Sequence, residues 1–172
     1  MEYTIDNTQP QSCRMTFLRA ELLYDIGNLA YVEGDLAGDD AHAAHQIFDV
    51  TQQGNVDRVT RILNLAFAAC VEALYPYTKK EDDGTERTDT LSIPESYTIT
   101  LTLPPGFSAT TLDLLAELIH EYIVCRVMAD WLSITKPDSQ ANWETKAAAA
   151  RQRMQTALMS RRGKVRRRTK PF

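Results

Sequence analysis

Two pairs of residues have the spacing that metal sites use. His42 and His45, which follow two aspartates, would lie on one face of a short helix. Glu117 and His120 have the spacing that carboxylate-bridged di-iron sites use twice, but the motif occurs once in this sequence. A structural zinc site needs four ligands, and His120 is the only histidine outside the first pair. We therefore predict no metal and no cofactor, with both pairs on solvated helix faces.

The nucleophiles are equally isolated. Cys13, Cys70 and Cys125 are odd in number and far apart, and the last two have apolar neighbours. This pattern predicts buried thiols in a reducing compartment rather than a disulfide framework. The sequence has no Gly-x-Ser-x-Gly motif, no glycine-rich phosphate loop and no HExxH motif. We predict that the protein is not an enzyme.

Charge is divided unevenly along the chain. Residues 146–172 contain ten of the 19 Lys and Arg residues and no acid, whereas residues 1–145 set nine cations against 23 acids. The formal net charge of −4 therefore hides a body of about −14 and an end of about +10.

The last twelve residues hold seven of those cations, which repel one another and bury little apolar surface. We predict that residues 161–172 form a basic arm, ordered by duplex phosphates or by the carboxylates of a partner. The alternative is a solvated extension. The expected contact residues are Arg161, Arg162, Lys164, Arg166, Arg167, Arg168, Lys170 and Phe172.

Composition predicts one folded body over residues 1–160. A chain of 172 residues with 44% hydrophobic and 24% charged residues is long and apolar enough to bury a core. No apolar stretch approaches the length of a membrane span, and the acidic start MEYTIDNTQP differs from a signal peptide. We expect synthesis in a cytosol-like compartment and no membrane partner.

Hydrophobic periodicity predicts a mainly α fold, a bundle of four to five helices. Ser12 is the expected cap of a first helix that ends before Gly34 and Gly38. The other helices are expected from Asp39 or Asp40 to about residue 54, from residue 56 to Pro76, from residue 111 to 135 and from about residue 141 to 160.

One segment has the alternation of a strand. Tyr97, Ile99, Leu101 and Leu103 alternate with threonines, which predicts a strand with one buried face. With the acidic loop of residues 79–90, whose role we do not assign, it forms a predicted β and loop arm at about residues 79–107. A lone strand needs a partner. The candidates are the residues before Pro94, the N-terminal EYTI and a neighbouring subunit.

The helix over residues 111–135 is more apolar than a helix on the surface should be. Its first half has a polar strip of Asp113, Glu117, His120 and Glu121. The same strip continues as Val124, Met128 and Trp131. This helix is therefore expected to be central or to be covered by another molecule.

The helical body, the strand-and-loop arm, the apolar helix and the basic end together resemble the small head–tail connector (adaptor) proteins of tailed bacteriophages. The closest likeness is LLAELIHEYIVCRVMADWLSIT followed by the terminal RRGKVRRRTKPF. The resemblance covers most of the chain from Met15 onward, in arrangement rather than in a diagnostic motif. The loop of residues 79–90 is a departure from the shortest members.

The resemblance implies a structural virion protein without an active site. About a dozen copies would form a ring in the neck, joining the portal to the tail and continuing the DNA channel. Its partners would be other copies, the portal protein, a tail or stopper protein and, without sequence specificity, duplex DNA. The implied contacts between subunits are Tyr97, Ile99, Leu101, Leu103, Val124, Met128 and Trp131.

Three alternatives stay open at this point. One is a small DNA-binding accessory protein that uses its basic tail, and another is a different neck or tail-completion protein. The third is an enzyme with an unrecognised site around His42, His45 and Glu117.

Overall fold

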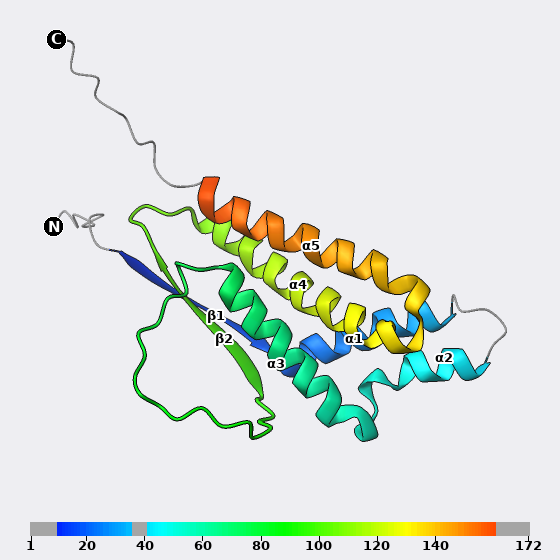
Figure 1. Ribbon diagram of the computed structural model, residues 1–172. Coiled ribbons are helices and arrows are strands. Elements are labelled where there is room, and N and C mark those ends of the chain that lie inside the picture. Colours follow the sequence, from blue (N-terminus) through cyan, green and yellow to red (C-terminus); the bar gives the residue numbers. More distant parts are fainter. Residues whose placement is uncertain (1–9, 36–40, 161–172) are drawn as a thin grey trace, which may run out of the picture.

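The structure is a computed structural model that describes residues 10–35 and 41–160. The described residues form five α-helices and one two-stranded antiparallel sheet, as the sequence predicts for a mainly α bundle with a small β element (Figure 1). The strands are β1 (Gln11–Leu18) and β2 (Ser96–Leu103), and the helices are α1 (Arg19–Asp35), α2 (Ala41–Phe48), α3 (Val56–Ala73), α4 (Ala109–Thr135) and α5 (Pro137–Ser160). Two short 3₁₀ turns, Asp49–Thr51 and Gln53–Asn55, connect α2 to α3.

The prediction that a helix begins at Ser12 is wrong. Residues 11–18 form β1, which pairs with β2, and α1 begins at Arg19. Met15 and Phe17 are buried while their neighbours Arg14 and Thr16 are exposed, so the segment has the two-residue period of a half-buried strand. The partner of β2 is therefore a segment of the same chain that was predicted to be helical.

The register of the sheet explains its two faces. Met15 lies opposite Ile99 and Phe17 opposite Tyr97, which places apolar pairs on the face that meets the bundle. Thr16 and Thr98 face each other on the outer side, with their hydroxyl oxygens 3.3 Å apart. Cross-strand pairs of this kind stabilise a two-stranded sheet, and packing against helices provides the rest.

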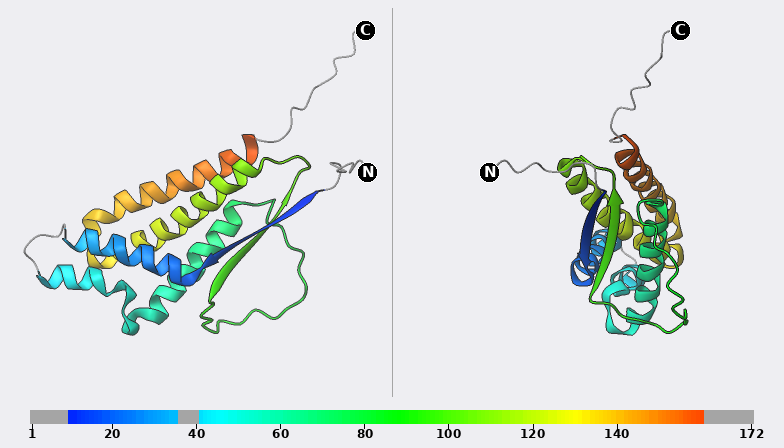
Figure 2. Two further views of the ribbon diagram at one scale, coloured as in Figure 1. Left: turned by 180° about the vertical axis from the view of Figure 1, so that it is seen from behind. Right: turned by 90° about the vertical axis from the view of Figure 1, so that its left-hand side faces the viewer.

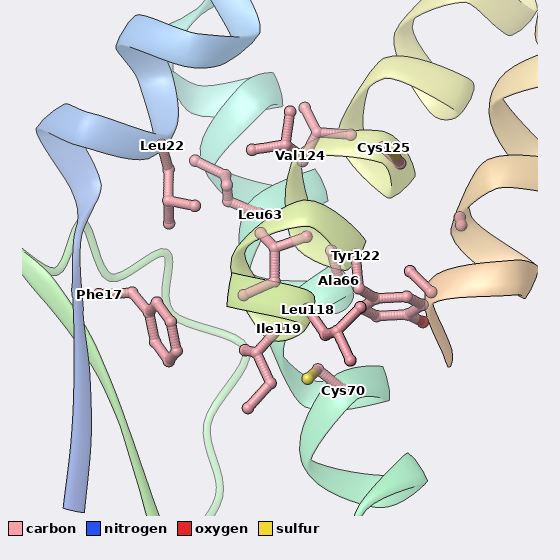
Figure 3. Packing of buried hydrophobic residues seen from close by; sticks show 14 of the residues in the cluster. Phe17, Leu22, Leu63, Ala66, Cys70, Leu118, Ile119, Tyr122, Val124 and Cys125 are labelled. Atoms are coloured by element: carbon pink, nitrogen blue, oxygen red, sulfur yellow. The ribbon is translucent and has the colours of Figure 1, made fainter. Parts of the chain in front are cut away.

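Helix α4 is the central helix of the bundle. It runs antiparallel to α5 and lies between α5 and α3, while α1 and α2 also contact it (Figures 1 and 2). Thirteen of its residues are buried. Figure 3 shows Ile119 and Tyr122 of α4 in one apolar cluster with Phe17 of β1 and Leu63 of α3. The apolar character of α4 on nearly every side is thus explained by burial within one chain.

The turn between α4 and α5 is fixed to α1 by a polar network. Helix α5 begins at Pro137, four residues earlier than predicted, because proline is tolerated in a first helical turn. Just before it, Lys136 Nζ lies 3.2 Å from Glu33 Oε2 and donates to the Glu33 backbone oxygen at 3.1 Å. The Trp143 indole N–H donates to Glu33 Oε1 at 2.9 Å. One carboxylate of α1 therefore holds the start of α5.

The segment between α3 and β2 is a long loop outside the bundle. Residues 79–90 are all exposed and have neither helix nor strand, and the loop forms a wide arch beside the sheet (Figures 1 and 2). Two contacts connect it to α3, an ion pair of 3.6 Å between Arg61 and Asp89 and a hydrogen bond of 3.2 Å from Asn64 to the Ser92 carbonyl. The loop therefore lies outside the core and is connected to the bundle through α3.

Candidate interaction surfaces

The basic arm lies outside the described residues. All eight of its predicted contact residues fall within residues 161–172, so its contacts stay a prediction. The His42 side chain is also outside the described part of the chain.

The structure places all seven residues that were assigned to inter-subunit contacts inside the core of a single chain. Tyr97, Ile99, Leu101, Leu103, Val124, Met128 and Trp131 are between 0% and 6% exposed. The strand residues pack between the sheet and the bundle, and the Trp131 indole N–H donates to the Ile47 carbonyl at 3.2 Å. Their burial needs no neighbouring subunit, and we correct the assignment accordingly. Any association must use other surfaces.

One such surface is a groove over α4, between α1 and α5, which we call the acid groove. It has a volume of about 600 Å³, and its floor includes Val124 and Trp143. Three carboxylates and one ammonium group line it, which leaves a formal charge of −2 with the imidazole neutral. The charged and titratable lining residues are Asp25, Glu117, His120, Glu121 and Lys146.

The polar side chains of the acid groove come from three helices. His120 Nε2 of α4 lies 2.8 Å from Asp25 Oδ2 of α1, which bridges the two helices at one edge. Lys146 of α5 lies over the Trp143 ring, with 4.1 Å from its nitrogen to the ring centre. Glu117 and Glu121 are exposed and form no ion pair among the described residues. Two carboxylates of the groove are thus available to a cation from outside.

The thiol at the base of this groove is poorly suited to nucleophilic chemistry. Burial, with the nearby charge of Glu121, raises the pKa of Cys125 to about 11. Burial likewise raises the pKa of Cys70 to about 12. A thiol reacts as its thiolate, and these pKa values keep both thiols protonated near neutral pH.

Glu117 and His120 do share the groove, and the described residues contain no group of three or more His, Cys, Asp or Glu that could hold a metal ion.

A second groove lies on the other side of α5, between that helix and the end of α3; we call it the basic groove. It has a volume of about 630 Å³. Lys79, Lys80 and Arg151 line it together with Glu72, which leaves a formal charge of +2. The three cations are exposed and form no ion pair among the described residues.

The sequence interpretation missed both grooves. It placed positive charge at the end of the chain and treated Lys79 and Lys80 as part of an acidic loop. The adjacent pair of lysines at the start of that loop was a local signal that could have been noticed. This pair and Arg151 are about 70 positions apart in the sequence, and only the packing of α3 on α5 brings them together.

Comparison with known proteins gives no relative for this chain: no family model, no curated protein and no solved structure matches it. Among the described helices, none combines the length and the apolar character that crossing a bilayer requires.

Proposed function

We propose that this chain is a structural subunit of a ring in the neck of a tailed bacteriophage. About a dozen copies would join the portal to the tail and continue the DNA channel, as the resemblance to head–tail connector proteins implies. The arm of residues 161–172 would meet portal protein or DNA. The subunit would act by its shape and charge and would have no active site.

The observation that carries this proposal is the combination of a helical body with a separate projecting loop. Helices α3, α4 and α5 form a bundle with a buried apolar core, and residues 79–90 extend from it fully exposed. A stiff bundle can repeat around an axis while loops and terminal arms reach neighbouring rings. The division of charge between an acidic body and a basic end supports the same interpretation, because one copy then carries surfaces of opposite sign.

Mass measurement of the purified chain and electron microscopy of negatively stained samples test the proposal. We expect closed rings of about a dozen copies with an open centre, either alone or after addition of the portal protein of the same phage. A stable monomer or dimer that does not bind portal and binds duplex DNA with a steep dependence on salt would instead favour the DNA-binding accessory protein.

Deletion of residues 161–172 separates the arm from the body. We expect the shortened chain to keep the helical circular dichroism signal and the melting temperature of the full chain but to lose binding to portal or DNA. A shortened chain that unfolds would contradict the assignment of this segment as an arm, and one that binds as before would contradict its role in docking.

A further inference from the structure

We infer that copies of this chain associate head to tail, with the acid groove of one copy against the basic groove of the next. This inference rests on the proposed function only in that a ring needs repeated contacts between copies. It identifies the two surfaces that make such a contact, and neither uses a residue outside the described part of the chain.

The two grooves are different surfaces of one subunit. Lys146 lines the acid groove and Arg151 lines the basic groove, and both belong to α5. Five positions of an α-helix correspond to a rotation of about 140° around its axis. Helix α5 is therefore a ridge with one groove on each side. Contacts between two different surfaces of identical subunits are heterologous, and they generate rings when the rotation closes.

The grooves are complementary in charge. Glu117 and Glu121 of the acid groove form no ion pair among the described residues, and neither do Lys79 and Lys80 of the basic groove. Like charges would oppose a contact between two acid grooves or between two basic grooves. Complementary potentials favour the pairing of unlike grooves and so set the head-to-tail direction.

Apolar atoms at both grooves add contact area. Leu29 lines the acid groove, and Ala68 and Val71 line the basic groove. Tyr75, which is 64% exposed, also lines the basic groove and can cover apolar surface on a partner. Exposed ion pairs alone contribute little, so this area is needed for a contact that lasts.

Charge reversal in one groove at a time tests the contact. The first variant combines Glu117→Lys with Glu121→Lys, and the second combines Lys79→Glu with Lys80→Glu. All four residues are exposed, so each variant should keep the circular dichroism spectrum and melting temperature of the parent. Self-association is measured by sedimentation velocity of the full chain at about 0.05 M salt, where surface charges are weakly screened, and at about 0.5 M.

We expect each variant alone to self-associate at least about tenfold more weakly than the parent at low salt. An equimolar mixture of the two variants should regain association, because every acidic groove in the mixture again finds a basic one. A matched control, Glu86→Lys with Glu95→Lys, reverses two exposed charges that line neither groove and should associate like the parent.

Three results would overturn the inference. Variants that associate like the parent would show that other surfaces make the contact, and rings seen by microscopy would then leave the proposed function standing. Loss of association in the first variant only, without recovery in the mixture, would assign the acid groove to another occupant such as residues 161–172. A parent chain that stays monomeric at low salt would show that the two grooves do not bind each other. The proposed function would then be tested separately, by ring formation after addition of portal protein.

Discussion

The substitution Glu33→Gln tests whether one carboxylate fixes the junction of α1, α4 and α5. Its side chain is 17% exposed, and it accepts hydrogen bonds from Trp143 at 2.9 Å and from Lys136 at 3.2 Å. Glutamine keeps an oxygen that can accept the indole N–H but removes the charge opposite Lys136. Losing one partner of a fully buried pair costs about 3–5 kcal/mol. Because the Lys136 side chain is 24% exposed and keeps some water, we expect a loss of about 2 kcal/mol of unfolding free energy.

For a chain of this length, a loss of about 2 kcal/mol corresponds to a melting temperature lower by about 4–8 °C. Urea unfolding followed by circular dichroism measures the free energy directly. The control is Glu144→Gln, the same change at an exposed carboxylate of α5 that accepts a hydrogen bond of 3.1 Å from Gln140. It should change the unfolding free energy by no more than about 0.5 kcal/mol.

The difference between parent and Glu33→Gln should also depend on pH. Burial acts to raise the pKa of Glu33, but the hydrogen bonds from Trp143 and Lys136 and the charge of Lys136 hold it below the ordinary value of 4.5. A carboxyl group whose pKa is lower in the folded state stabilises that state above its unfolded pKa, and this contribution is lost as the pH falls through the folded pKa. The difference should therefore be full near neutral pH and shrink below pH 4.5.

Two outcomes would refute this reasoning. If Glu33→Gln and the control unfold at the same urea concentration, the network does not stabilise the junction. If the difference persists unchanged well below pH 4.5, the effect of the substitution comes from packing rather than from the carboxylate charge. A double-mutant cycle with Lys136→Met then separates the pair from each side chain's own contribution.

Two other predictions concern the core. A methyl group at Gly34 of α1 would overlap the Phe48 ring, so Gly34→Ala should lower the unfolding free energy by about 1–3 kcal/mol. The control is Gly27→Ala in the same helix, where the added methyl would lie 3.1 Å from the Thr51 methyl and should change the unfolding free energy by about 1 kcal/mol or less. Equal urea midpoints for the two variants would contradict this prediction. Iodoacetamide should modify the half-buried Cys13 of the native protein well before the buried Cys70 and Cys125, and mass spectrometry measures the order of modification. Modification of all three thiols at the same rate would mean that the core opens readily.

The helix α3 and the strand β2 could be predicted from sequence because each depends on a local period. Val59, Ile62, Leu63 and Ala66 recur on one face of α3, and all four are buried. Tyr97 to Leu103 alternate, and the apolar members of that run face the core. A periodic series of apolar residues forms one continuous face of a helix or strand, and this face is the one that becomes buried. Such elements can therefore be recognised without knowing their partners.

Strand β1 could not be predicted in the same way. Phe17 and Leu18 fit the helical series that continues with Leu22 and Ile26, and Phe17 also fits the strand series with Met15. Short apolar runs of this kind fit a helix and a strand equally well. This segment forms a strand because it pairs with β2, about 80 residues further along the chain. The Glu33 network has the same character, since its partners are 103 and 110 positions away.

The burial of α4 also limits the surfaces that the proposed ring contact can use. Because Val124, Met128 and Trp131 are covered within one chain, a contact between copies has to use exposed charge and small apolar patches. Each such contact is weak and sensitive to salt. A copy inside a closed ring makes two contacts where the end of an open chain makes one, so closure converts weak pairs into a stable assembly. We therefore expect intermediate oligomers to be scarce, with monomers and complete rings exchanging as the salt concentration changes.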